Sequence, residues 1–328
     1  MDFLLSHFKV SIILPKGFKT VYKNKMKQEF LRRKFEVIEF FYETPLKEHQ
    51  IIYYLKDVDA AVVGGENITQ EVIEKTKRLK IIAYFGVGVD KINLKAAKEK
   101  SIYVTNAPNA NAISVAEFTM GLILNCMRKI CFSHNQLRGN NWQMVIGSEC
   151  GEKILGIIGL GSIGKEVAKR ASYLGFNIRA FDINHNYEFV RRYDIKYISL
   201  DQLLSISDII TIHLPLNSKT RWMINKTKIN KMKNLSYLIN TSRGEIVDEQ
   251  ALIEALELKI ISGVALDVFK NEPPSRKNKL FKFNSLRSIT TSHVAAGTIE
   301  AANRIAEVTR NNIILVSKEQ KPLFITNK

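Results

Sequence analysis

Three polar side chains of complementary chemistry, Arg243, Glu272 and His293, each follow an apolar run in the C-terminal half of the chain. An arginine guanidinium can hold a carboxylate through two parallel hydrogen bonds. An imidazole can exchange a proton near neutral pH, and a neighbouring glutamate can orient it. In open α/β sheets the ligand cleft lies outside the carboxyl ends of the strands. We therefore expect these three residues to converge on one cleft that transfers a proton.

Each of the three residues also has a simpler interpretation. His293 could be held by backbone groups at a strand end, and Glu272 could be an exposed loop residue. Arg243 could form a surface ion pair, which is the usual fate of an arginine. The residue types alone leave these alternatives open.

A glycine pattern gives the second chemical signal. The apolar run Ile154–Ile158 ends in Gly159, Gly161 and Gly164, spaced as G-x-G-x-x-G, and residues 165–170 are typical of a helix start. The first glycine permits a tight turn, the second lets the backbone approach a pyrophosphate, and the third lets helix and strand pack closely. The helix N-terminus then faces the phosphates, so the pattern predicts a dinucleotide site.

A carboxylate follows at the spacing that such a site requires. A second apolar run ends in Asp182, roughly 20 residues past Gly164, where an acid can accept hydrogen bonds from an adenosine ribose. No arginine follows directly, and the carboxylate would repel a 2′-phosphate, so we expect NAD rather than NADP. The alternative is an ordinary β-α turn with a solvent-exposed aspartate.

Taken in order, these segments resemble the NAD-dependent D-2-hydroxyacid dehydrogenases. The similar strings are GIIGLGSIGKEVA, INTSRGEIVDEQAL, GVALDVFKNEPP and TSHVAAGT. Upstream, FGVGVDKINLKAA and APNANAISVAEFTMGLIL look most like the D-3-phosphoglycerate dehydrogenase branch. The resemblance runs from about residue 60 to about residue 312. Because the sequence stops soon after the last expected helix, we expect a short form without the regulatory domain of longer members.

The resemblance also implies roles for single residues. His293 is the expected acid–base, Glu272 its partner, and Arg243 the clamp on the substrate carboxylate, which the backbone of Gly86, Val87 and Gly88 also binds. His213 is left open between a structural role and cofactor contact. No metal is expected. The implied cofactor contacts, with Asp267 beside the nicotinamide, are Gly159, Gly161, Ser162, Ile163, Gly164, Asp182, Leu214, Thr241, Ser242 and Asp267.

The implied reaction is hydride transfer between nicotinamide and C2 of a D-2-hydroxy or 2-oxo acid. The nearest match is D-3-phosphoglycerate dehydrogenase; the alternatives are a glyoxylate or hydroxypyruvate reductase and a D-lactate-type dehydrogenase. An alternative of another class is a dinucleotide-sensing, corepressor-like binding protein. Members of the nearest branch commonly carry arginine at the positions of Val63 or Tyr84, and both are uncharged here. Because a phosphate needs cationic or N–H partners, this departure leaves a phosphorylated substrate open.

Alternating strands and helices predict parallel sheets with crossover helices. The expected fold is α/β, with two doubly wound domains: a Rossmann-type nucleotide domain inserted into a flavodoxin-like substrate domain. We expect the substrate domain over residues 1–107 plus 296–328 and the NAD-binding domain over 108–295. Helices are expected at 21–34, at about 112–137 with a capping box from Ser114 to Glu117, and at about 298–316. The main expected strands are 9–14, 35–41, 60–63, 81–84, 102–105, 154–158, 177–181, 208–212, 237–240, 262–268 and 288–291.

Length and composition fit this organisation. A chain of 328 residues with 45% apolar residues is long enough for two domains. The formal net charge of +17 is spread along the chain without a run of like charges, which favours a solvated basic surface over nucleic-acid binding. The first nine residues lack the features of a signal peptide, and the three cysteines match no metal spacing. We expect a cytoplasmic homodimer that binds a small acid and no membrane.

Overall fold

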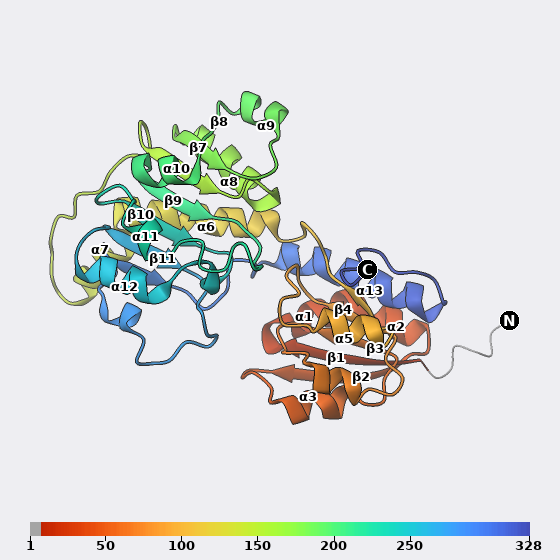
Figure 1. Ribbon diagram of the computed structural model, residues 1–328. Coiled ribbons are helices and arrows are strands. Elements are labelled where there is room, and N and C mark those ends of the chain that lie inside the picture. Colours follow the sequence, from red (N-terminus) through yellow and green to blue (C-terminus); the bar gives the residue numbers. More distant parts are fainter. Residues whose placement is uncertain (1–7) are drawn as a thin grey trace. The chain divides into compact units, whose positions relative to one another are not determined.

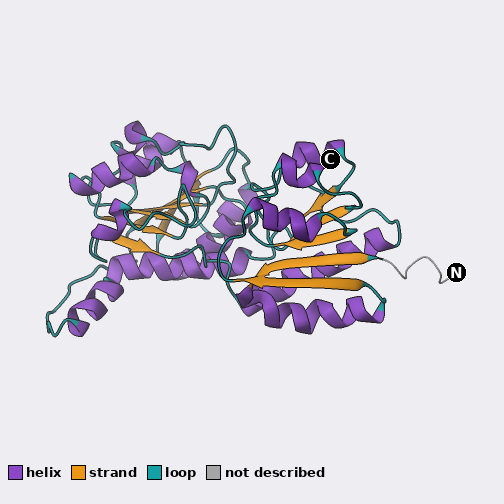
Figure 2. Ribbon diagram, turned by 90° about the horizontal axis from the view of Figure 1, so that it is seen from below, coloured by secondary structure: helices purple, strands orange, loops and turns teal. Residues whose placement is uncertain are grey.

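The computed structural model describes residues 8–328 and divides into two compact units (Figure 1). Unit 1 comprises the chain up to Asn111 together with Gly297–Lys328, and unit 2 comprises Ala112–Ala296. Each unit contains one wholly parallel sheet with helices packed against it (Figure 2). The expected α/β fold with two doubly wound sheets is therefore confirmed.

Unit 1 contains a five-stranded sheet in the order β2-β1-β3-β4-β5. Its order reverses between β1 and β3, as in flavodoxin-like folds, so the ligand-binding switch point lies beyond the carboxyl ends of these two strands. The strands are β1 (Lys9–Pro15), β2 (Glu36–Tyr42), β3 (Ala60–Val63), β4 (Ile81–Tyr84) and β5 (Tyr103–Thr105).

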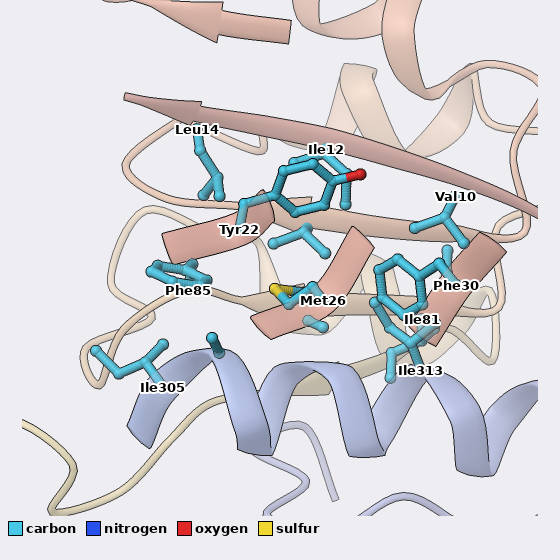
Figure 3. Packing of buried hydrophobic residues seen from close by; sticks show 14 of the residues in the cluster. Val10, Ile12, Leu14, Tyr22, Met26, Phe30, Ile81, Phe85, Ile305 and Ile313 are labelled. Atoms are coloured by element: carbon cyan, nitrogen blue, oxygen red, sulfur yellow. The ribbon is translucent and has the colours of Figure 1, made fainter. Parts of the chain in front are cut away.

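Side chains that alternate along the strands bury both faces of this sheet. On β1, Ile12 packs into one core and its neighbour Ile13 into the other. The first core contains residues of α1 (Lys19–Tyr22), α2 (Gln28–Arg32) and α13 (Ile299–Ser317). The second contains residues of α3 (Glu48–Leu55), α4 (Gln70–Glu74) and α5 (Leu94–Glu99). Figure 3 shows Ile305 and Ile313 of α13 pointing toward the sheet.

Unit 2 contains a seven-stranded sheet in the order β12-β11-β10-β9-β6-β7-β8. The order reverses between β6 and β9, which is the Rossmann arrangement. The strands are β6 (Ile154–Ile158), β7 (Asn177–Phe181), β8 (Lys196–Tyr197), β9 (Ile209–Ile212), β10 (Tyr237–Asn240), β11 (Gly263–Leu266) and β12 (Ser288–Thr290). The helices are α6 (Ala112–Arg128), α7 (Ile130–Arg138), α8 (Ser162–Tyr173), α9 (Tyr187–Arg192), α10 (Leu200–Ile206), α11 (Lys226–Ile229) and α12 (Glu249–Glu257).

Two helix predictions were wrong in detail. The single helix expected at about 112–137 is broken by Lys129, whose φ of 56° lies in the left-handed region, and Asn125 accepts a hydrogen bond from the backbone of Cys131 across the break. The helix begins at Ala112, so Ser114 lies inside it and the predicted capping box does not form its start.

The helix expected at 21–34 is also interrupted, because a π-helical turn, Lys23–Lys27, separates α1 from α2. The expectation about a signal peptide rests on the first nine residues, seven of which lie outside the described part of the chain. From residue 8 onward, no helix is long and apolar enough to cross a bilayer.

The burial of α13 makes a prediction about stability. Ile313 is fully buried in unit 1, whereas Ile299 on the same helix is 70% exposed. Ile313→Ala should lower the free energy of unfolding by about 2–5 kcal/mol, because it removes buried contacts and leaves a cavity. Ile299→Ala, the matched control, should change it by less than about 0.5 kcal/mol. Urea unfolding followed by circular dichroism measures both, and equal losses would contradict this account of α13.

Candidate active site

The glycine turn after β6 has the shape of a phosphate cradle. Gly159 has a φ of 95°, and a Cβ there would lie 2.4 Å from the backbone oxygen of His213. A Cβ on Gly164 would lie 2.0 Å from the backbone oxygen of Gly159. A Cβ on Gly161 would meet nothing within 4 Å. Two glycines are therefore required by the packing of the turn itself, and the third leaves space in which a ligand can approach the backbone.

The start of α8 adds electrostatics to that space. Gly161 is the N-cap residue, so no side chain caps the first turn, which Ser162 and Ile163 open. The N-terminus of a helix carries partial positive charge and directs its amides outward, an arrangement that favours a phosphate group. The cradle and the helix start together fit the pyrophosphate of a dinucleotide.

Asp182, just past the end of β7, is joined to the same turn. Its Oδ2 accepts a hydrogen bond from Leu160 N at 2.6 Å, and its Oδ1 accepts one from Asn184 N at 2.7 Å. The Gly159 amide donates to the oxygen of Phe181 at 2.8 Å. The carboxylate is therefore fixed beside the turn, where its charge can select against a 2′-phosphate.

His293 and Glu272 meet beyond β12 and β11. The Nδ1 atom of His293 lies 2.9 Å from Oε2 of Glu272, whose Oε1 accepts from Phe269 N at 3.3 Å. The imidazole side chain is 44% exposed. A carboxylate at Nδ1 fixes the proton on that nitrogen, which leaves Nε2 for exchange with a substrate oxygen.

Asp267 holds the loop that carries His293. This fully buried carboxylate accepts hydrogen bonds from Thr291 Oγ1 at 2.6 Å, Val294 N at 2.9 Å and Ala295 N at 2.9 Å. Its backbone oxygen accepts from His293 N at 2.9 Å. Asp267 thus fixes the position of the imidazole. Sequence reasoning missed this role, and missed Thr291 entirely.

Arg243 follows β10 in a tightly bonded turn. Its Nη1 donates to the oxygen of Ser242 at 2.7 Å, and its own backbone oxygen accepts from Asn240 Nδ2 at 2.9 Å. A Cβ on Gly244 would lie 2.0 Å from the backbone of Phe269. This close approach brings the turn that carries Arg243 against the turn that leads to Glu272.

The remaining residues expected to contact the cofactor lie on neighbouring strand ends. Thr241 Oγ1 lies 3.0 Å from Thr119 Oγ1 on α6, and Ser242 Oγ donates to Ile212 O at 2.6 Å. Leu214 lies beside the glycine turn, with Cδ2 2.9 Å from where a Gly159 Cβ would be.

His213 is a buried, neutral residue. Its Nε2 lies 3.0 Å from Thr211 Oγ1, and its Nδ1 is buried with no hydrogen-bond partner among the described residues. Burial lowers the pKa of His213 to about 3. The ring therefore stays uncharged at physiological pH, and its Nδ1, unpartnered within residues 8–328, leaves the structural role and the cofactor contact of His213 both open.

Gly86, Val87 and Gly88 belong to unit 1, where they follow β4 at the carboxyl edge of the sheet. Gly86 O accepts from Ala107 N at 2.9 Å, and Val87 O accepts from Asn106 Nδ2 at 2.6 Å. Within residues 8–328, no group of three or more His, Cys, Asp or Glu side chains is arranged to hold a metal ion.

The Rossmann sheet, the glycine cradle and the acid beside it define a dinucleotide-binding domain. Residues 120–295 match the NAD-binding domain of the D-isomer specific 2-hydroxyacid dehydrogenases. The chain is 37% identical, over 298 residues, to a glyoxylate reductase of Thermofilum pendens, covering 87% of this chain and 86% of that protein. The chain therefore belongs to the D-isomer specific 2-hydroxyacid dehydrogenase family, and its cofactor is NAD.

Two further comparisons agree. A D-3-phosphoglycerate dehydrogenase of Methanocaldococcus jannaschii is 40% identical over 282 residues, which cover 85% of this chain and 53% of that protein. The chain thus spans about half of that relative. The structure of a D-lactate dehydrogenase of Aquifex aeolicus, complexed with NAD and lactic acid, superposes with a TM-score of 0.82 at 29% identity, covering 94% of this chain and 96% of that one.

The charge of Asp182 makes a prediction about the cofactor. The unmodified protein should prefer NADH over NADPH, because the 2′-phosphate would lie near this carboxylate. Asp182→Asn, which keeps an acceptor for the Leu160 amide, should narrow the preference by about tenfold or more, or roughly 1.4 kcal/mol. The ratio of kcat/KM for the two cofactors measures the effect. Equal values in the unmodified protein would refute the assigned role of Asp182.

Proposed function

We propose that this dehydrogenase reduces the C2 carbonyl of a small 2-oxo acid, with His293 as the proton donor. The observation that carries the proposal is the pairing of His293 with Glu272 at 2.9 Å, in a loop fixed by the buried Asp267. A half-exposed imidazole whose Nδ1 faces a carboxylate has the protonation chemistry that ketone reduction requires.

Bound NADH supplies the hydride. His293 donates a proton from Nε2 to the carbonyl oxygen as C2 becomes the alcohol carbon, and the reverse reaction removes that proton. Glu272 positions the imidazole and stabilises its cationic form. Arg243 binds the substrate carboxylate through its guanidinium and polarises the reacting oxygen. The amides of Gly86, Val87 and Gly88 are proposed to bind the carboxylate as well.

We also propose that the protein is a homodimer that works in the cytoplasm. The arm formed by α7 and residues 139–149 exposes large apolar side chains, which soluble monomers rarely cluster. The loop of this arm extends from unit 2 in Figure 1. A second copy that packs against the arm would cover these side chains. Three free thiols agree with a reducing compartment. The exposed residues are Ile130, Leu137, Trp142, Met144 and Ile146.

The exposed apolar side chains of the arm predict that a charged substitution there will dissociate the dimer. Trp142 is 91% exposed in the single chain. Trp142→Glu should convert a dimer into monomers at micromolar concentration, because a charge would be buried at the interface. Trp222→Glu, at a 51% exposed tryptophan outside the arm, should leave the dimer intact. Sedimentation equilibrium distinguishes the two states. A protein that is monomeric before any substitution would contradict the dimer.

The catalytic assignment predicts the effect of removing the imidazole. His293→Ala should lower kcat by about 10²–10⁴-fold, the usual loss for a general acid, while NADH still binds. Glu272→Gln should also lower kcat, because the cationic imidazole loses its carboxylate. His49→Ala, an exposed histidine on α3, is the matched control and should change nothing. NADH absorbance measures turnover and NADH fluorescence measures binding. Full turnover in His293→Ala would exclude the proposed role.

A further inference from the structure

A buried acid lies at the switch point of the sheet in unit 1, outside the residues assigned above. Glu66 follows β3 by three residues, in the segment Gly64-Gly65-Glu66, and is 5% exposed. Its Oε2 accepts a hydrogen bond from Gly64 N at 2.6 Å. Its Oε1 is buried and has no hydrogen-bond partner among the described residues. A buried acceptor of this kind calls for an explanation, and a water or ligand that fills the position is one.

Two tyrosines accompany this acid at the same edge of the sheet. Tyr42 is the last residue of β2, and Tyr84 is the last residue of β4. Tyr84 pairs with Val63 at the end of β3, so the parallel strands bring these groups to one edge. The Tyr42 hydroxyl interacts with the Glu66 carboxyl, and Tyr84 interacts electrostatically with Tyr42.

Glycines in both adjoining loops make room for the rings. A Cβ on Gly65 would lie 3.4 Å from the Tyr42 hydroxyl, and the φ of Gly65 is 144°. A Cβ on Gly86 would lie 2.6 Å from Cε1 of Tyr84. The ring of Tyr84 thus rests on the first glycine of the loop proposed to bind the substrate carboxylate. This contact places the tyrosine–acid cluster beside that loop, within the same unit.

The cluster suits an uncharged polar group. Burial raises the pKa of Glu66. The Tyr42 hydroxyl and nearby backbone amides lower this pKa, but their effect is smaller than that of burial. When protonated, a carboxyl both donates and accepts, as does a phenol, so these groups then match the hydrogen bonding of an alcohol. An ionised carboxyl would instead repel a phosphate, and no guanidinium stands at the ends of β3 or β4 to neutralise one.

We propose that Glu66, with the hydroxyls of Tyr42 and Tyr84, forms the subsite for the C3 substituent of the substrate and selects a hydroxyl there over a phosphate. The inference rests on the proposed function, and it identifies the substrate class as 3-hydroxy-2-oxo acids. Glu66 is then a specificity residue that contacts the substrate away from the reacting carbon.

Three acids that differ only at C3 test the subsite: pyruvate, hydroxypyruvate and 3-phosphohydroxypyruvate, each with NADH. The unmodified protein should favour hydroxypyruvate over each of the other two by about tenfold or more in kcat/KM, because a site built to bind a hydroxyl rejects an analogue that lacks it. A tenfold preference for the phosphorylated acid would overturn the proposal.

Substitutions of Glu66 distinguish the effect of its charge on substrate choice from the effect of its hydrogen bonds. Glu66→Leu should lower kcat/KM for hydroxypyruvate about tenfold and leave that for pyruvate nearly unchanged. Glu66→Gln keeps a hydrogen-bonding end, so it should retain most activity on hydroxypyruvate and raise activity on the phosphorylated acid. Glu71→Gln, an exposed acid on α4, is the control and should alter neither ratio.

A purely structural role for Glu66 would give a different pattern. Equal losses on pyruvate and hydroxypyruvate would overturn the subsite. If Glu66→Leu does not fold, Glu66→Gln and Tyr84→Phe test the subsite in its place. Ratios of kcat/KM among the three acids that stay unchanged in both variants would overturn the proposed subsite. If the unmodified protein reduces none of the three acids, the proposed function is refuted together with the subsite. If it reduces them but the variants leave the kcat/KM ratios unaltered, only the subsite is refuted.

Discussion

The buried carboxylate of Asp267 is the contact on which the candidate active site depends. A carboxylate without exposure to water is strongly destabilising unless hydrogen bonds satisfy it. Thr291, Val294 and Ala295 supply those bonds, and all three belong to the loop around His293. The φ of 53° at His293 costs on the order of 1–2 kcal/mol, which the surrounding bonds offset. The imidazole therefore meets Glu272 in one defined orientation.

Local patterns in the sequence were sufficient to predict most of the fold. Short apolar runs bounded by polar residues or glycine located β3, β4, β6, β7 and β10 at their observed bounds. These predictions succeeded because a strand buried on both faces has few polar residues, whatever its partners are. The glycine spacing likewise predicted the turn, since each glycine meets a local steric requirement.

The errors arose where side-chain hydrogen bonds, rather than the apolar pattern, decide the local conformation. The apolar pattern of the helix continues past Lys129, whereas the break is stabilised by a hydrogen bond from the Cys131 backbone to the Asn125 side chain, which the apolar pattern does not reveal. The Asp267 carboxylate accepts hydrogen bonds from residues that lie 24 to 28 positions further along the chain. No sequence motif predicts a contact over that separation. Nor does any motif point to Glu66, whose burial results from the meeting of three strand ends.

The two sheets use their switch points in a similar way. In unit 2 the glycine turn follows β6, beside the gap in strand order between β6 and β9. In unit 1 the segment from Gly64 to Glu66 follows β3, beside the gap between β1 and β3. In both places the crossover connections leave in opposite directions, which opens a space above the strand ends. Glycines then let the backbone or a ring approach that space.

We expect groups close to each space, rather than the net charge of +17, to decide which ligand that space accepts. Charges on the surface are screened over about 8–10 Å at physiological ionic strength, so dispersed lysines attract anions only weakly and without selectivity. A carboxyl within a few ångströms acts far more strongly because little water lies between the groups. Asp182 stands near the expected ribose and Glu66 near the proposed C3 substituent. In this basic chain, two acids at the strand ends would thus exclude an additional phosphate from the cofactor and from the substrate alike.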